Sequence, residues 1–208
     1  MPNQYLIQIL KLGPTIWNQW REKNEDIKPN LSCALLIGLN LSKVNFVNVN
    51  LHGANLEKAD LSGAYLSGAN FSGARLIGAN LSGVNPNHTL FSKISFKNAD
   101  LRNVEFYKAN LSGADFEHAN FQKAHFLDTD LSGANLSRAD LRNITSYDVN
   151  FSNADLSYAD FSGSILHRAN LSTALIGSTV FNTSDLSEAK LPVTFNWNRL
   201  NLDGQYTN

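Results

Sequence analysis

The chain has 208 residues, 43% of them hydrophobic, and its 17 Lys and Arg nearly balance its 18 Asp and Glu. This balance argues against a strongly basic nucleic-acid binder and against a strongly acidic imitation of DNA. Cys33 is the only cysteine, so an intrachain disulfide is excluded and cysteine usage leaves the redox compartment undetermined.

Residues 1–28 predict a helical cap. Their apolar stretch is short, is interrupted by Gln8 and Lys11, and has no basic lead before it. We therefore expect neither a signal peptide nor a membrane-spanning helix, and a soluble, cytoplasmic protein that does not bind a membrane. Residues 3–12 predict a helix with Leu6, Ile9 and Leu10 on one side, ended by the Gly-Pro pair that follows it.

Thr15 is expected to N-cap a second helix that continues to about Asn24. Trp17 and Trp20 would form its apolar face. We expect the two helices to cover the first coil of the structure that follows, and a role of the two Trp in binding a partner is the alternative.

Residues 29–193 contain a repeat with a period of five. From Leu31 to Leu191, 33 successive central positions are all Leu, Phe or Ile except Pro86 and Ser146. Two residues before the centre, 19 of 32 positions are Ala, and one residue before it, 21 of 33 are Asn or Asp. The consensus is A-(N/D)-L-S-G. A period of five fits neither a helix nor an ordinary strand, and it predicts a chain that turns a corner once in every repeat.

Such short sides cannot bury their apolar residues alone, so successive coils must stack. The large central residue and the small residue two positions earlier would point inward, and the other three would face out. Gly and Asn suit the corners because they tolerate unusual backbone angles.

This pattern resembles the pentapeptide-repeat family, whose signature is tandem A-(D/N)-L-x-x, and the lead-in around Trp17 is similar to cyanobacterial members. The resemblance implies an all-β solenoid: a right-handed quadrilateral β-helix with four pentapeptides per coil. On that basis residues 29–193 form about eight coils, or a rod roughly 40 Å long at about 4.8 Å per coil.

The tail, residues 194–208, follows a break in register at Pro192 and carries Phe195, Trp197, Leu200 and Leu202. We expect it to cap the last coil. Dimerisation through this end, which the family resemblance implies for some members, is the alternative to a monomer.

The missing N–H of Pro86 predicts a local bulge over residues 85–90, with Leu90 replacing the absent core residue.

No catalytic motif is present: G-x-S-x-G, a P-loop, H-E-x-x-H and C-x-x-C are all missing. No two His side chains fall at the same place on neighbouring coils, so no metal ladder is predicted, and a metal pair at His118 and His125 is a minor alternative. The Asn and Asp columns, such as Asn80, Asp100 and Asn120, are expected to bond the corners rather than to bind calcium. We expect no enzyme activity and no cofactor.

With four pentapeptides per coil, the chain sorts into four sides, and one side is irregular. Both exceptions to the central rule fall on it. A candidate partner-binding face on this side comprises Tyr65, His88, Tyr107, Lys108, His125, Leu127, Tyr147, Asp148, His167 and Arg168. Exposed aromatics rimmed by polar groups are typical of recognition surfaces. Neutral drift of the repeat is the alternative explanation.

The favoured function is a non-enzymatic protein-interaction or scaffold protein, and a regulatory role is compatible with it. Two alternatives stay open: a DNA mimic that protects a topoisomerase, as the resemblance implies for some members, and an inert structural spacer. Fold alone does not choose among them.

Overall fold

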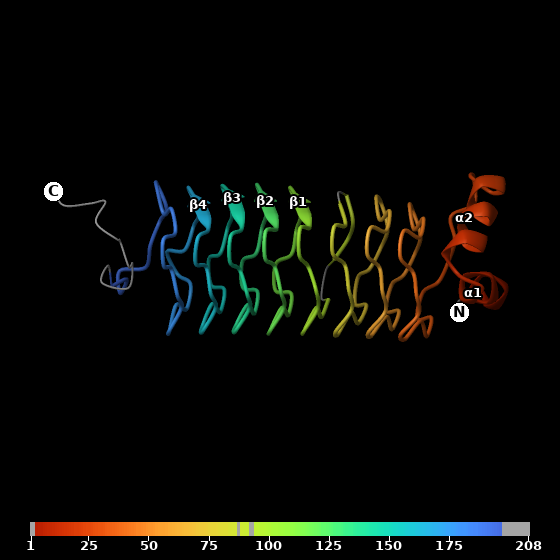
Figure 1. Cartoon of the computed structure of the whole chain (residues 1–208), viewed down its shortest axis with the longest axis horizontal. Coiled ribbons are helices and arrows are strands. Elements are labelled where there is room, and N and C mark those ends of the chain that lie inside the picture. The colour runs from red at the N-terminus through yellow and green to blue at the C-terminus, as the bar shows by residue number, and fades with distance from the viewer. Residues whose placement is uncertain (1–2, 87, 92–93, 197–208) are drawn as a thin grey trace.

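The computed structural model describes residues 3–86, 88–91 and 94–196, which form a helical hairpin followed by a rod of stacked coils (Figure 1). Helix α1 spans Gln4–Lys11 and helix α2 spans Pro14–Lys23. Four strands form one parallel sheet in the order β1-β2-β3-β4, and their bounds are Glu105–Tyr107, His125–Leu127, Thr145–Tyr147 and Ile165–His167. The architecture is the predicted right-handed quadrilateral β-helix.

Each coil takes four pentapeptides, as the family resemblance implies. Parallel bridges join equivalent residues of neighbouring coils, from Asn30↔Asn50 to Asn170↔Lys190. Within this ladder the Leu31 N–H donates to Asn50 O at 2.8 Å, and the Asn50 N–H donates to Pro29 O at 2.9 Å. Successive coils are thus joined by backbone hydrogen bonds that run along the axis of the rod.

The corners are β-turns with a left-handed third residue. In the first one the Ala34 N–H donates to Leu31 O at 3.0 Å, and Cys33 has a φ of 57°. Positive φ at the third position is the mark of a type II turn. Gly38 occupies the next such position without strain, whereas Lys43 holds the same backbone with φ 56°, at a conformational cost of about 1 kcal/mol.

Asn and Asp before the central residue bond the corners, which confirms that prediction. Asn30 Oδ1 accepts the backbone N–H of Ser32 at 3.0 Å, and this Asx bond recurs along the rod. Some of these side chains also join neighbouring coils: Asn80 Nδ2 donates to Asp60 Oδ1 at 3.1 Å. The Asn and Asp side chains before the central residues therefore stabilise both the turns and the stacking of the coils.

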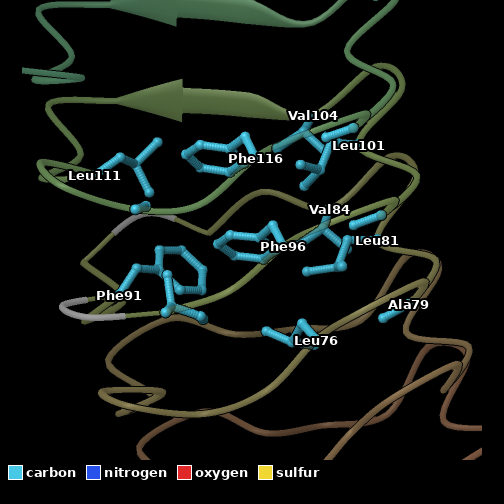
Figure 2. Packing of buried hydrophobic residues seen from close by; sticks show 14 of the residues in the cluster. Leu76, Ala79, Leu81, Val84, Phe91, Phe96, Leu101, Val104, Leu111 and Phe116 are labelled. Atoms are coloured by element: carbon cyan, nitrogen blue, oxygen red, sulfur yellow. The ribbon is translucent and has the colours of Figure 1, made fainter. Parts of the chain in front are cut away.

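The interior is a set of stacked apolar columns (Figure 2). Phe96 and Phe116 lie directly over one another, with ring centroids 5.0 Å apart and planes 3° apart. Small or branched residues such as Val84 and Val104 fill the space beside them. Side chains of alternating size can interdigitate at the density of a normal core.

Hydroxyl groups replace Ala at several interior positions and share one bonding pattern. Thr129 is buried, and its Oγ1 donates to the carbonyl of Phe106 on the preceding coil at 3.1 Å. The same bond is made by Thr89, Ser164, Thr179 and Ser184. A buried hydroxyl costs little stability when it is hydrogen-bonded in this way.

Pro86 keeps its place in the core, and the prediction that Leu90 replaces it is wrong. Pro86 is buried, whereas Leu90 is 58% exposed. The bridges Tyr65↔Asn85 and Asn70↔Leu90 keep the register of the ladder on either side, so these pairs show none of the shift that a bulge would produce. Turning Leu90 inward would require a one-residue slip that turns the next central side chain outward.

The first cap helix is confirmed, whereas the second begins earlier than predicted. Asn3 caps α1 through its Oδ1, and Leu6, Ile7, Ile9 and Leu10 are buried. The N-cap of α2 is Gly13, so the assignment of Thr15 to this position is wrong. Pro14 is the first helical residue, where a missing N–H is harmless and a fixed φ is favourable.

Helix α2 is joined to the first coils by both apolar and polar contacts. Trp17 is fully buried and its Nε1 donates to Asn45 O at 2.8 Å, while Trp20 is half-buried. Arg21 is also buried and donates to Ile27 O and Val47 O. These contacts show the two Trp side chains facing the rod. At the other end Phe195 packs on Phe181 at 5.8 Å, and Trp197, Leu200 and Leu202 lie outside the described residues.

Candidate partner-binding face

The four strands all lie on the irregular side, in four successive coils, whereas the coils of this side at Phe46, Leu66 and Leu186 keep their turns. None of the four strands begins with Asn, Asp or Ser, so the Asx-type bond is missing, and none has Gly at the corner. Sides such as that of Leu35, which end in Gly, keep their turns. Aromatic and β-branched residues favour the extended backbone that results. Among the described sides, those of Leu175 and Val180 near the end of the rod meet both conditions and still turn.

A column of outward-facing side chains follows the carboxyl ends of the four strands, and we refer to Tyr107, Leu127, Tyr147 and His167 as the aromatic stripe. The register Tyr107↔Leu127, Leu127↔Tyr147 and Tyr147↔His167 places them on successive strands. Tyr107 is 44% exposed, and Leu127 and Tyr147 are each 40% exposed. The structure thus gathers three large apolar side chains into one outward row.

Charges of both signs line the corner beside the stripe. Lys108 Nζ lies 5.2 Å from the centre of the Tyr107 ring, which is within cation–π range. Arg168 donates twice to the carboxylate of Asp148, at 2.7 and 2.6 Å. This pair lowers the pKa of Asp148, chiefly through its hydrogen bond with Arg168. Such two-point pairing fixes both side chains in place.

His167 closes the stripe at its distal end. Its ring meets that of Tyr147 edge-on at 5.8 Å, and its Nδ1 lies 2.9 Å from Ser187 Oγ. Glu188 Oε1 lies 4.0 Å from the other ring nitrogen. The imidazole is therefore held against the stripe and is less exposed than the two tyrosines.

The remaining candidates lie on the same side but apart from the stripe. His125 is exposed at the start of β2. Tyr65 is 60% exposed and lines a hollow of about 220 Å³ with Val47, Ser67 and Asn85. His88 is exposed at a corner with a φ of 60°. The ten predicted residues thus comprise the stripe with the charges beside it, His125 at the start of β2, and a separate pair, Tyr65 and His88, nearer the cap.

The other sides carry ion pairs that the sequence reading did not assign. Arg75 pairs with Glu57 across one coil step at 2.6 Å, and Lys97 pairs with Glu117 in the same way. These pairs could have been predicted from the sequence, because their opposite charges are separated by about one coil of 20 residues. Exposed pairs of this kind contribute little stability each.

The described part of the chain offers neither a metal cluster nor a membrane span. Over residues 3–86, 88–91 and 94–196 no three His, Cys, Asp or Glu side chains gather closely enough to hold a metal ion. His118 instead lies 3.8 Å from Glu117. Neither cap helix has the length and apolar character that crossing a membrane requires.

A four-sided β-helical rod with this five-residue pattern defines a class of solenoid protein. The chain belongs to the pentapeptide repeats family, whose profile matches in 8 copies over residues 30–68, 69–106, 87–117, 109–145 and 147–182. The predicted family is thereby confirmed. Comparison with curated proteins gives no match.

Solved structures of similar proteins include HetL, a pentapeptide repeat protein involved in heterocyst differentiation regulation, from the cyanobacterium Nostoc sp. strain PCC 7120. It is 24% identical over 84% of this chain and 91% of HetL, with a TM-score of 0.48. A trypsin-treated form of QnrB1, a plasmid-mediated fluoroquinolone resistance protein, is 25% identical over 76% of this chain and 90% of its own, with a TM-score of 0.34. A pentapeptide repeat protein from the Arabidopsis thaliana thylakoid lumen is 28% identical over 59% of this chain and 72% of its own, with a TM-score of 0.24.

Proposed function

We propose that this protein is a non-enzymatic interaction protein that holds a protein partner on the aromatic stripe. One observation carries the proposal: three large apolar side chains stand exposed in a row on a flat sheet, flanked by charges. Contiguous exposed apolar side chains rimmed by polar groups mark interaction sites, and the few residues that carry most of the binding energy at protein interfaces are enriched in Tyr, Trp and Arg.

The rod suits this role because its surface is formed before the partner arrives. Backbone bonds hold each strand of the sheet to its neighbours, and the aromatic core beneath is stacked, as Phe106 on Phe126 at 5.4 Å shows. A rigid surface loses little conformational entropy on binding. We therefore expect rigid-body association with little change in the rod.

The test is affinity capture from native extract with the wild type and with the Tyr107→Ala/Tyr147→Ala double variant. A partner bound by the wild type and lost by the variant supports the proposal. Tyr158→Ala is the matched control, since Tyr158 is 61% exposed on another side of the rod. A partner retained by the double variant contradicts the assignment of this face, and no partner for either chain favours the inert spacer.

The DNA-mimic alternative predicts rows of uncompensated negative charge. Here Asp100 and Asp140 are paired with Arg102 and Arg142, just beyond them on the same sides. We therefore expect the protein to leave gyrase supercoiling and its inhibition by a quinolone unchanged, and a supercoiling assay with purified enzyme checks this. Protection of gyrase would replace the interaction proposal with the mimic.

A further inference from the structure

We infer that the aromatic stripe is the contact surface of a symmetric dimer, in which a second copy of this chain packs antiparallel against β1–β4. The inference rests on the proposed function and names the partner as the chain itself. A two-fold interface uses the same patch twice, so every residue must suit the one that rotation brings opposite.

The stripe meets this requirement because the order of its apolar residues, Tyr-Leu-Tyr, is the same from either end of the rod. Tyr107, Leu127 and Tyr147 lie on successive strands and are exposed to nearly the same extent. A two-fold axis along β2 sets Leu127 opposite its own copy and Tyr107 opposite Tyr147 of the second copy. Equal spacing of the coils in both copies lets these rows mesh, as in two sheets packed face to face about 10 Å apart.

The charges at the corner favour this position of the axis over one midway between β2 and β3. They run Lys108, Asp128, Asp148 and Arg168 on successive coils. Rotation about β2 places Lys108 opposite Asp148 of the second copy, twice in the dimer. Moving the axis midway between β2 and β3 would instead place Lys108 opposite Arg168 and Asp128 opposite Asp148, and like charges that meet at an interface oppose association.

One feature of the monomer supports the pairing, and a second opposes it only weakly. Arg168 already holds the Asp148 carboxylate at 2.6 Å, so its position is fixed before the copy arrives. Asp128 faces its own copy under this rotation, but it is exposed at the corner, outside the apolar row. Water screens charges at the rim of an interface, so this contact costs less than a buried one.

The sheet is short, and the dimer is therefore weak. Four strands cover about 20 Å of the rod. Because one side of the rod is narrow, the area that this length can bury is well below the roughly 800 Å² per partner of a stable complex. We expect a Kd on the order of 10–100 µM. Sedimentation velocity of the full chain from about 5 to 500 µM covers this range.

Leu127→Asp is the first test variant, because it places two carboxylates on the axis. We expect dimerisation to weaken at least about tenfold. Leu35→Asp is the matched control: Leu35 is exposed on another side, and its replacement should leave sedimentation unchanged. The thermal unfolding of each variant, followed by circular dichroism, shows that the rod is intact.

The decisive test mixes two chains that each fail alone. Lys108→Asp puts Asp opposite Asp148, and Asp148→Lys puts Lys opposite Lys108, so each variant should be monomeric. In an equimolar mixture the new Asp faces the new Lys, and the second contact remains the original Lys108–Asp148 pair. The mixture should dimerise to near the wild-type extent.

Three results would overturn the dimer: a wild-type monomer at every concentration, a dimer unaffected by Leu127→Asp, or a mixture that stays monomeric. If the chain is monomeric while capture of another protein still depends on Tyr107 and Tyr147, this inference fails and the proposed function stands. If the chain dimerises as described and captures nothing else, the partner is the second copy.

Discussion

Replacing Trp17 with alanine tests whether the helical cap stabilises the rod. Trp17 is fully buried against Phe46 and Trp20, at ring distances of 5.8 and 5.4 Å. An aromatic side chain of this kind buries roughly 150–250 Å², worth about 4–6 kcal/mol as an upper bound. Losing the hydrogen bond to Asn45 O costs about 1 kcal/mol, whereas partial collapse of the site recovers some of the total. We expect a net loss of about 4 kcal/mol.

Hydrogen exchange of single amides is the suitable assay, because a solenoid can unfold from one end and a single unfolding free energy is then poorly defined. A loss of about 4 kcal/mol corresponds to roughly a thousandfold faster exchange. The effect should be largest at first-coil amides such as Leu31 and Leu36, which lie in the inter-coil ladder. Amides near Phe161 should change far less.

Two variants separate burial from bonding. Trp17→Phe keeps an aromatic ring and loses the N–H donor, so it should cost about 2 kcal/mol. Trp20→Ala removes a half-buried ring and should cost about 1–2 kcal/mol. Equal effects of Trp17→Ala and Trp20→Ala, or uniform acceleration along the whole rod, would refute the role assigned to Trp17 in holding the cap on the first coil.

The other predictions concern single bonds and turns. Thr129→Val removes the buried hydroxyl that donates to Phe106 O and should speed hydrogen exchange of the neighbouring amides about fivefold, the equivalent of about 1 kcal/mol. Lys123→Gly relieves a φ of 60° and should slow exchange of the amides around this corner about two- to fivefold, the equivalent of about 0.5–1 kcal/mol. The lowered pKa of Asp148 means that its pair with Arg168 stabilises the fold above the ordinary pKa of Asp and that this contribution is lost as pH falls through the depressed value. Arg168→Gln should therefore raise the Asp148 titration midpoint in NMR and destabilise the rod at neutral pH more than in strong acid; an unchanged midpoint would show that the pair does not exist in solution.

The five-residue period predicted most of the fold because the same repeated residues form the turns, the core and the contacts between coils. The same Asn30 that marks the consensus also bonds the Ser32 amide and pairs with Asn50 in the next coil. Each side therefore repeats the previous one, and the central residues of the whole rod could be placed from the sequence. The residues of the aromatic stripe could be aligned in one column because the family resemblance implies four pentapeptides, or 20 residues, per coil.

Other features depend on contacts that no period reveals. Arg21 reads as a surface residue of a helix, yet it is buried and bonds two carbonyls of the first coils. Its Nε has no hydrogen-bond partner among the described residues, and burial lowers the pKa of its guanidinium. The start of α2 was misplaced at Thr15 because an N-cap side chain was expected where Gly13 and Pro14 fix the backbone. The four strands were missed. The absence of Asn or Asp before the central residue and of Gly at the corner was interpreted as an irregular repeat, rather than as a sign of extended backbone.

The division of the rod into coils of four pentapeptides also governs how its length can change in evolution. Gain or loss of four pentapeptides adds or removes one coil and leaves every side aligned with itself above and below the change, as the unbroken register from Asn30 to Lys190 illustrates. Gain or loss of a single pentapeptide keeps the core intact but turns the remainder of the rod by one side relative to its cap. A pentapeptide duplicated before Glu105 would thus rotate the β1–β4 sheet by a quarter turn about the axis, and would change where a bound partner sits without altering any residue it touches.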